Sequence, residues 1–221
     1  LAFAAAGMDG FDAVGHAMAA IATGGFSSHD AGLGHFQSPA IEWIATLFML
    51  LSALPFVLYV HLLRGQAGPL LGEDQVRLFL AMIATGVALI TVWLMRHHDV
   101  PFLDALRLSA FNLVSLITTT GFTSHDFSLW GAFPGLILVT AMLVGGCTGS
   151  TAGGIKMFRL WLLFRSVGVQ LASQAFPRGV FRVTYNGRRV SEEILEGAIT
   201  NFFDYLSTVA LLSLALGLAG L

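Results

Sequence analysis

The sequence has 221 residues, of which 56% are hydrophobic and 11% are charged, and its formal net charge is −2. The charged share is less than half of the roughly 25% that a soluble domain carries, which argues against a water-soluble globular protein and for a membrane protein. The single cysteine, Cys147, excludes a disulfide framework and a multi-cysteine metal site within the chain. Because the sequence begins at Leu1 without a methionine and stops inside an apolar run, we expect a fragment of a longer protein.

The longest apolar segments predict four membrane spans. Charge-free runs that approach the ~20 residues of a spanning helix cover 43–60, 78–95, 132–155 and 205–221. Nine of the eleven Lys and Arg residues fall within 64–77 and 156–189, and positively charged loops stay in the cytoplasm. We therefore predict alternating spans at 41–63, 77–95, 132–163 and 194–221. Segments 10–30 and 101–126 then both lie outside, so each must enter and leave the membrane on one side.

The first predicted element is a short helix over 11–21, and a similar one is predicted over 102–117. A helix of about 16 residues reaches only ~24 Å, which is less than the ~30 Å thickness of the hydrocarbon core. The second segment also carries Asp104, Arg107 and Asn112. We predict two re-entrant helices that stop at half depth; an amphipathic helix on the outer surface is the alternative.

Each short helix is followed by nearly the same nine letters, ATGGFSSHD at 22–30 and TTTGFTSHD at 118–126. Non-helical backbone at membrane depth is tolerated where it lines a wet cavity, and glycine permits a backbone that aims successive carbonyl oxygens at one axis. Rings of carbonyls replace the water shell of a cation in selective filters. We therefore predict two filter segments, made of Ala22, Thr23, Gly24, Gly25, Phe26, Thr118, Thr119, Thr120, Gly121 and Phe122.

Alternatives remain open at these segments. A glycine after a helix is commonly a C-cap that is followed by an ordinary loop. The acidic residues that end the repeats, Asp30 and Asp126, either concentrate cations at a pore mouth or cap the helix that follows. We do not expect a metal site at His29 or His125, because no third ligand follows at a suitable spacing.

The span after the second repeat is predicted to be broken. Residues 132–164 would measure roughly 50 Å as one helix, and their middle, GGCTGSTAGGIK, contains five glycines that disfavour a continuous helix. We predict half-helices at about 134–144 and 155–167, joined by an intramembrane loop that acts as a gate; close helix packing through small residues is the alternative. The gating residues are Gly145, Gly146, Cys147, Thr148, Gly149, Ser150, Thr151, Ala152, Gly153, Gly154 and Lys156.

The glycine-rich loop matches neither of two common catalytic patterns. Ile155 separates Gly154 from Lys156, which departs from a phosphate-binding loop. Ser150 lacks the flanking residues of a serine-hydrolase elbow. We therefore expect that the chain is not an enzyme.

A cytoplasmic segment and a span complete the chain. Asn-Gly at 186–187 predicts a β-hairpin within 168–193, and the arginines there either hold the topology or dock a cytoplasmic partner. Asp204 lies about ten residues into the last span, where an ionisable group is a functional hypothesis by default. The alternatives are that Asp204 lies near the interface or pairs with a basic residue such as Lys156.

These motifs together resemble the Trk/Ktr/HKT superfamily of potassium uptake proteins, and its bacterial TrkH branch most closely. The resemblance covers nearly all of the chain and rests on ATGGFSSHD at 22–30, TTTGF at 118–122, GGCTGSTAGGIK at 145–156 and NGRRV at 186–190. It implies an all-α membrane protein built from repeats of span, re-entrant pore helix and span, of the potassium-channel type. One broken span carries the intramembrane loop.

The resemblance also implies how the chain is divided. Its parts are a second-repeat pore helix, filter and span at 1–63, a cytoplasmic linker at 64–76, a third repeat at 77–167, a cytoplasmic segment at 168–193 and the first span of a fourth repeat at 194–221. Asp204 departs from the aromatic and aliphatic run that usually begins that last span. The first repeat and most of the fourth are expected to lie outside this chain, which alone should not conduct.

The function implied by the resemblance is potassium uptake across the bacterial plasma (inner) membrane, with potassium held by the filter backbone. It further implies a multi-pass protein in the lipid bilayer, a homodimer and a TrkA-like cytoplasmic subunit. A nucleotide is expected only through that regulatory partner, and neither a covalent cofactor nor a nucleic acid is expected. The alternatives are a sodium-coupled or sodium-permeable transporter of the same superfamily, an alternating-access transporter, and a non-conducting scaffold or regulatory subunit.

Overall fold

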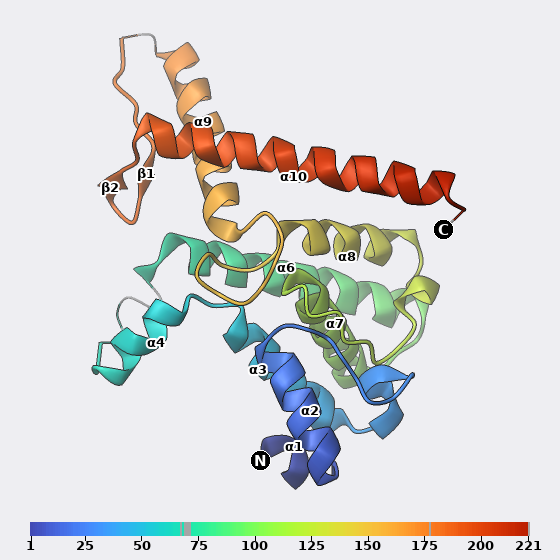
Figure 1. The fold of residues 1–221 in the computed structure, drawn as a ribbon. Coiled ribbons are helices and arrows are strands. Elements are labelled where there is room, and N and C mark those ends of the chain that lie inside the picture. The colour runs from blue at the N-terminus through green and yellow to red at the C-terminus, as the bar shows by residue number, and fades with distance from the viewer. Residues whose placement is uncertain (67, 69–71, 177, 221) are drawn as a thin grey trace. The chain divides into compact units, whose positions relative to one another are not determined.

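The computed structural model describes residues 1–66, 68, 72–176 and 178–220. These residues form two compact units, Leu1–Lys156 and Met157–Leu221. Nearly all of their regular structure is helical (Figure 1), so the all-α expectation is confirmed. Positions 67 and 69–71 of the predicted linker, 177 of the predicted cytoplasmic segment and 221 of the predicted last span lie outside the described residues.

The first unit is built around the second half-length helix. Its described helices are α1 (Ala2–Ala5), α2 (Gly10–Ile21), η1 (Gly32–Phe36), α3 (Pro39–Ser52), α4 (Phe56–Leu63), α6 (Asp74–His97), α7 (Phe102–Ile117), η2 (Phe127–Trp130) and α8 (Ala132–Val144). Helix α7 packs against α3, α6 and α8, whereas α2 packs against α1 and α3. Fully buried Phe79, Ile90 and Phe111 lie in the core between α6 and α7.

The two predicted half-length helices are present as α2 and α7. Helix α2 begins after Asp9, whose carboxylate accepts a hydrogen bond from the N–H of Asp12 at 2.7 Å. Helix α7 begins directly after Pro101. With 12 and 16 residues, the helices measure about 18 and 24 Å. Both are therefore too short to cross the ~30 Å hydrocarbon core.

Two described helices, α6 and α10 (Glu192–Leu218), are long and apolar enough to cross a membrane. The predicted span at 41–63 is not one straight helix: α3 ends at Ser52, α4 begins at Phe56, and the two are bent by 93°. Pro55 explains the bend, because proline has no N–H and its ring clashes with the carbonyl four residues earlier. The pair remains a candidate for a single, broken span.

The predicted break in the span at 132–163 is present. Helix α8 ends at Val144 and α9 begins at Met157 (Met157–Ala175), and the twelve residues between them, 145–156, form no helix. Gly145, Gly149 and Gly154 in this loop have φ between 79° and 84°, where glycine avoids the strain that other residues meet. The second half-helix extends to Ala175, beyond the predicted end at 167.

The second unit contains α9, a hairpin and α10. Strands β1 (Thr184–Tyr185) and β2 (Arg188–Arg189) pair antiparallel, and the turn residues Asn186 and Gly187 have φ of 48° and 73°. Two successive positive φ values are typical of a type I′ turn, so the predicted hairpin is confirmed. In α10, none of the apolar stretch is buried within the described residues, and Asp204 is exposed.

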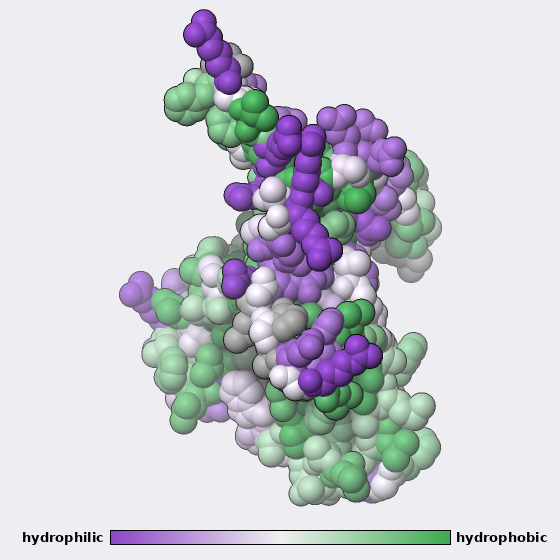
Figure 2. Space-filling model, turned by 90° about the vertical axis from the view of Figure 1, so that its left-hand side faces the viewer, coloured by the Kyte–Doolittle hydropathy of each residue, from purple (hydrophilic) through white to green (hydrophobic). Residues whose placement is uncertain are grey.

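Large apolar side chains cover much of the exterior. In Figure 2 they gather on the lower part of the visible face, over the N-terminal helices. In α2 and α3, Phe11, Met18 and Leu47 are exposed to 80%, 67% and 53%. Contiguous apolar surface of this kind marks a membrane or protein contact.

Candidate functional site

The two repeated segments leave their helices with the same backbone geometry. Thr23 and Thr119 have φ of 50° and 56°, and Gly25 and Gly121 have φ of 67° and 83°. In both copies, therefore, left-handed residues recur two positions apart. A left-handed φ is uncommon for a β-branched residue, so its occurrence at two equivalent threonines indicates a specific conformation and not a chance distortion.

Hydrogen bonds at the helix ends explain the left-handed threonines. The N–H of Gly24 donates to the carbonyl of Ala19 at 2.8 Å, and the N–H of Thr120 donates to the carbonyl of Ser115 at 2.9 Å. A bond of this type around a left-handed residue is the Schellman motif. The C-cap alternative is therefore correct for the helix ends, but a threonine and not a glycine occupies the left-handed cap position.

The hydroxyl groups of the two threonines are also placed alike. Thr23 Oγ1 donates to the carbonyl of Ala22, and Thr119 Oγ1 donates to the carbonyl of Thr118, both at 2.7 Å. Such local bonds from a side chain to the backbone favour non-helical conformations at helix ends. Each threonine thus helps to hold the backbone that follows its helix.

The next carbonyl groups are not used by the fold. Among the described residues, no N–H or O–H group donates a hydrogen bond to the carbonyl oxygens of residues 23–25 or 119–121. Backbone carbonyls in partly buried segments are normally satisfied by a donor. These oxygens are therefore available to another partner, and a cation is the partner that rings of carbonyls accept in ion filters.

The two segments lie in direct contact at Gly25. A Cβ atom on Gly25 would overlap the carbonyl oxygen of Thr120 and lie 2.9 Å from its carbonyl carbon. At Gly121 a Cβ would meet nothing within 4 Å. Both the positive φ and the close contact with Thr120 therefore require a glycine at position 25, whereas only the positive φ favours a glycine at position 121.

Burial differs between the copies. In the second copy Thr118, Thr120 and Phe122 are exposed to 0%, 4% and 2%. In the first copy Ala22 is exposed and Phe26 is 79% exposed. The second segment is enclosed by the first unit, and the first segment is open.

The predicted gating loop, residues 145–156, reaches the start of both segments (Figure 1). The N–H of Gly153 donates to Thr119 Oγ1 at 2.7 Å. Thr151 Oγ1 lies 3.1 Å from the carbonyl oxygen of Ile21 and 3.2 Å from that of Ser52. Since Ile21 is the last residue of α2 and Thr119 is the second residue after α7, the loop contacts both short helices at their C-terminal ends.

The loop also fills the break between α3 and α4. Three backbone hydrogen bonds join the two: Cys147 N–H to the Ala53 carbonyl at 3.0 Å, Phe56 N–H to the Gly149 carbonyl at 2.9 Å, and Thr151 N–H to the Ser52 carbonyl at 3.4 Å. Polar backbone groups at membrane depth must be satisfied within the protein. The backbone N–H and carbonyl groups that the bend between α3 and α4 leaves free are thus hydrogen-bonded to the backbone of the loop.

At its base the loop is closed. The N–H of Lys156 donates to the Val144 carbonyl at 3.1 Å, and Lys156 Nζ donates to the carbonyl of Ala152. A Cβ on Gly154 would lie 2.6 Å from the Cα of Gly145, so these two glycines permit the ends of the loop to touch. The amino group is turned back onto the loop.

Side-chain and packing contacts hold the rest of the loop. Cys147 is fully buried, the N–H of Thr148 donates to Gln75 Oε1 at 3.0 Å, and Ser150 Oγ donates to the carbonyl of Cys147 at 2.6 Å. A Cβ on Gly146 would lie 3.2 Å from the Cβ of Ala53. The loop is therefore tightly packed against α3 and α6.

The two predicted pore-mouth residues are exposed. Asp126 Oδ1 accepts hydrogen bonds from the N–H and the hydroxyl of Ser128 at 3.0 and 2.6 Å, which lower the pKa of that carboxyl below its ordinary value. Asp126 thus caps η2, as the capping alternative predicts. Because the Asp126 side chain is exposed, the same carboxylate that caps η2 also faces solvent and is able to attract cations there.

An outer cluster on the first copy was not predicted from sequence. Asp12 accepts a hydrogen bond from Ser28 Oγ at 2.5 Å and pairs with His29 Nε2 at 2.9 Å. His16 Nε2 lies 2.9 Å from Ser27 Oγ. The only sequence signal was the repeated Ser-His pair after each filter segment. Within the described residues, no group of three or more His, Cys, Asp or Glu side chains is arranged to hold a metal ion.

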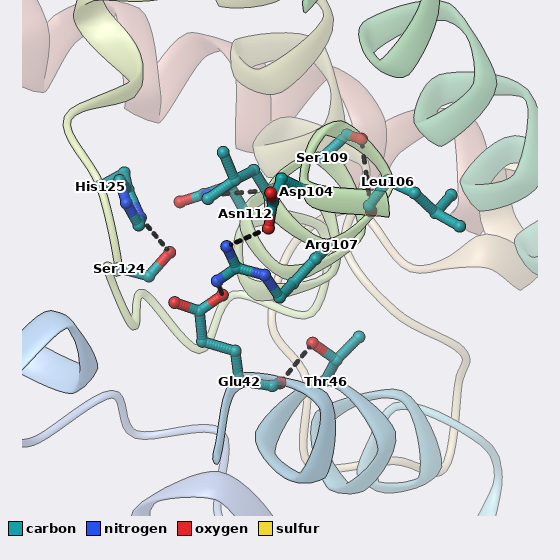
Figure 3. Close-up of polar contacts among 10 residues, drawn as sticks. Glu42, Thr46, Asp104, Leu106, Arg107, Ser109, Asn112, Ser124 and His125 are labelled. Carbon is teal, nitrogen blue, oxygen red and sulfur yellow. Dashed lines mark hydrogen bonds and ion pairs between the residues drawn. The ribbon is translucent and has the colours of Figure 1, made fainter. Parts of the chain in front are cut away.

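A second unpredicted feature joins α3 to α7. Figure 3 shows the Arg107 guanidinium between the carboxylates of Asp104 and Glu42, at 2.9 and 2.6 Å. The Glu42 side chain is 3% exposed and that of Arg107 is 14% exposed. Because α3 follows the first repeated segment and α7 precedes the second, this ion pair ties the two copies together.

Comparisons with known proteins agree over nearly the whole chain. Residues 4–216 match the family model described as TrkH, cation transport protein. The Trk system potassium uptake protein TrkI of Halomonas elongata is 39% identical over 222 residues, which cover 100% of this chain and 45% of the relative. The Trk system potassium uptake protein TrkH of Escherichia coli is 37% identical over 211 residues, which cover 95% of this chain and 44% of that protein.

The fold has a close match among solved structures. The crystal structure of the potassium transporter TrkH from Vibrio parahaemolyticus superimposes with a TM-score of 0.88 at 32% sequence identity. The match covers 99% of this chain and 47% of the crystallised chain. The chain therefore spans a little under half the length of the proteins that it matches.

Proposed function

The chain belongs to the TrkH family of cation transport proteins, and on that premise we propose that it supplies two filter segments and the gate of a potassium uptake pore. One observation carries the proposal: residues 22–26 and 118–122 share left-handed backbone at matching positions and lie in contact. The carbonyls of residues 23–25 and 119–121 accept no hydrogen bond from the described part of the chain. They are therefore able to replace the water shell of a cation.

The direction of the short helices supports a cation over an anion. Helices α2 and α7 both end at the proposed filter segments, and a helix C-terminus carries a partial negative charge. The N-termini, which attract anions, lie at the far ends beside Asp9 and Pro101. An anion site would require the reverse orientation.

A monovalent ion fits these segments better than a divalent one. Residues 22–26 and 118–122 contain no acidic side chain, whereas proteins hold calcium and magnesium largely with carboxylates. Neutral carbonyl oxygens suit a weakly hydrated ion. The choice of potassium over sodium rests on the relatives, which are potassium uptake proteins by name.

We assign the gate to residues 145–156. This loop has no regular structure and contacts Ile21 and Thr119, which lie directly before or within the two filter segments. Its five glycines permit a second conformation at low steric cost. A displacement of the loop would open the path below the filter, and its return would close the path.

Further assignments extend beyond this chain and rest on the family. They are a homodimer, a TrkA-like nucleotide-binding partner on the cytoplasmic side and a place in the bacterial inner membrane. The basic hairpin at Arg188–Arg189 is the part of the second unit that we assign to contact with that partner. A sodium-permeable transporter is the alternative that the ion competition test below addresses.

Rubidium uptake tests the proposal. The full-length protein that we expect to contain this chain is reconstituted in liposomes, and uptake of rubidium is measured with excess potassium or sodium outside. Gly25→Ala is compared with Gly24→Ala. A Cβ at Gly25 overlaps the Thr120 backbone, and φ there is positive. A Cβ at Gly24 meets the movable Phe26 ring at 3.2 Å and the Ala19 carbonyl oxygen at an ordinary 3.9 Å.

We expect potassium but not sodium to block wild-type uptake, Gly25→Ala to abolish uptake and Gly24→Ala to retain most of it. Equal block by sodium would favour the sodium-permeable alternative. Wild-type uptake that Gly25→Ala leaves intact would overturn the filter assignment. No uptake at all would favour the scaffold alternative.

A further inference from the structure

The gating loop and the second filter segment meet at one hydroxyl group. Thr119 Oγ1 donates to the carbonyl of Thr118 at 2.7 Å and accepts the N–H of Gly153 at 2.7 Å. A threonine hydroxyl has one donor and two acceptor sites, so both bonds form together. We infer that Thr119 is a positioning residue that couples the loop to the filter, because the loop leaves only by breaking this bond.

The first copy provides a natural comparison within the same molecule. Thr23 has nearly the same φ as Thr119 and makes the same bond to the preceding carbonyl. The loop does not use the Thr23 hydroxyl; its contact with the first copy is from Thr151 Oγ1 to the carbonyl of Ile21. The coupling therefore belongs to Thr119 and is not a general property of the repeated sequence.

The fit between loop and filter depends on a glycine. A Cβ on Gly153 would lie 3.1 Å from Thr119 Oγ1 and 3.6 Å from its Cβ. The distance to Oγ1 is tighter than ordinary side-chain contact, so a larger residue would require the loop or Thr119 to shift. Gly153 has no positive φ, so close approach to Thr119, and not backbone strain, accounts for the glycine.

The hydrogen bond from Gly153 to Thr119 thus links the position of the loop to the conformation of the filter segment. When the loop moves, Thr119 Oγ1 loses the hydrogen bond that it accepts from the N–H of Gly153. The hydroxyl still donates to the carbonyl of Thr118, which lies in the filter segment. Coupling between two sites is reciprocal by thermodynamic necessity. An ion in the filter should therefore change how readily the loop is released. This inference rests on the proposed function for the identity of the ion and of the gate.

The test uses Cys147 as a reporter of loop release. Cys147 lies in the loop and is fully buried, so a membrane-permeant maleimide reacts with it only when the loop moves. Labelling is measured on the full-length protein in liposomes, with a Cys147→Ser protein to subtract any other thiol. Rubidium uptake is measured on the same preparations.

Four variants isolate the bond. Thr119→Val removes the hydroxyl with little change in shape, and Thr119→Ser restores it. Thr23→Val removes the equivalent hydroxyl in the copy that the loop does not use. Thr148→Val removes a hydroxyl from the loop but keeps the backbone N–H through which Thr148 donates to Gln75.

We expect Thr119→Val to raise the labelling rate of Cys147 about 5-fold, the effect of losing one ordinary hydrogen bond, and Thr119→Ser to return it to the wild-type rate. Thr23→Val and Thr148→Val should leave labelling unchanged. In wild type, replacing sodium by potassium should change the labelling rate, and Thr119→Val should weaken that response. Equal labelling effects of Thr119→Val and Thr23→Val, or none from either, would overturn the inference.

Failure of the inference and failure of the proposed function give different results. If wild type takes up rubidium and Gly25→Ala does not, but Thr119→Val labels like wild type, the filter stands and the coupling is wrong. If wild type takes up no rubidium but Thr119→Val still labels faster than Thr23→Val, the bond holds the loop and the proposed function is wrong.

Discussion

Residues 22–26 and 118–122 share one alternation of backbone φ, yet the first segment is open and the second is enclosed. Phe26 is 79% exposed, and its equivalent Phe122 is 2% exposed. If burial dictated the backbone, two such different environments would not give the same φ values. The shared geometry therefore comes from what the copies share, which is a helix end, a threonine and a glycine two residues later.

The difference between the copies lies in what surrounds them. The loop donates hydrogen bonds to Thr119 and to the end of α2, but only in the second copy is the acceptor a side chain of the repeated segment. Ser115 Oγ also donates to the carbonyl of Phe122 at 2.7 Å, whereas the equivalent position in the first copy is Ala19. Local sequence thus sets the backbone conformation of each repeated segment, and tertiary contacts set how firmly that segment is held.

The largest effect is expected from a glycine substitution in the open first copy, although burial alone would suggest that the enclosed second copy tolerates substitutions less well. Gly25→Ala should cost more than Gly121→Ala, because the Cβ at position 25 overlaps the Thr120 backbone while that at 121 meets nothing within 4 Å. For Gly121→Ala the only expected cost is the strain of a left-handed backbone at alanine, about 1–2 kcal/mol. We expect loss of rubidium uptake for the first and a partial decrease for the second. The reverse order would show that burial and not inter-segment contact limits these positions.

The next prediction concerns the ion pair that joins the copies. Glu42→Gln removes a buried charge 2.6 Å from Arg107 Nη1. Breaking a buried pair costs about 3–5 kcal/mol, and we expect about 2 kcal/mol here because glutamine still accepts a hydrogen bond and Arg107 retains Asp104. Thermal unfolding in detergent measures the effect.

Asp104→Asn is the matched control for that substitution. Asp104 pairs with the same guanidinium at 2.9 Å but is 52% exposed, and exposed pairs contribute about 0–1 kcal/mol. A shift in unfolding temperature for Asp104→Asn as large as that for Glu42→Gln would contradict the view that the buried member of the pair holds the two copies together.

A smaller effect is expected when one copy is converted toward the other. Ser115→Ala removes the donor to the Phe122 carbonyl and gives the second copy the residue that the first has at Ala19. Loss of one buried hydrogen bond should lower the free energy of unfolding by about 1–2 kcal/mol. Hydrogen exchange of the 118–122 amides should rise. Unchanged exchange would mean that this bond does not distinguish the copies.

The smallest effect concerns the outer ends of the repeats. Asp126→Asn keeps an acceptor for Ser128 but removes the charge, so it separates capping from electrostatic attraction of cations. We expect a small decrease in unfolding temperature at pH 7, because the charged form of the cap is the stabilising one, and a modest decrease of uptake, about 2-fold, at low ionic strength only. Asp30→Asn should lower uptake alike, since Asp30 is also exposed. A loss of stability without a salt-dependent change in uptake would leave Asp126 as a cap alone.

The pKa of Asp126 fixes the sign of its pH dependence. Its hydrogen bonds from Ser128 lower the pKa below the ordinary value of 3.8, so the cap stabilises the folded state fully above the unfolded-state pKa and is lost as pH falls through the folded one. Between pH 5 and 8 the wild type and Asp126→Asn should therefore keep a constant difference in unfolding temperature. A difference that changes within that range would implicate another group.

Much of the fold was readable from the sequence because its signals are local. Pro101 and the polar residues of 102–117 delimit a helix that the structure places at Phe102–Ile117, and Asn186 and Gly187 form the expected turn. Glycine content likewise located the break after Val144. These features depend on neighbouring residues, which is why composition and spacing were sufficient.

The features that were missed depend on contacts between distant residues. Pro55 lies in a continuous apolar run, so hydropathy predicted an unbroken span at 41–63, although the proline itself was a signal of the bend. Nothing in the sequence indicates that Gly153 meets Thr119, or that Glu42 meets Arg107 across 65 positions. The residues of the candidate filter were therefore predictable, and their coupling to the loop was not.

The central claim is that the two segments form one cation site from backbone oxygens. Anomalous diffraction from crystals of the full-length protein grown with rubidium, and with sodium as the control, tests it most directly. The account predicts a rubidium peak within coordination distance of carbonyl oxygens from both 23–25 and 119–121, absent in the control. A peak held by side-chain carboxylates elsewhere, or no peak at these segments in a protein that takes up rubidium, would contradict it.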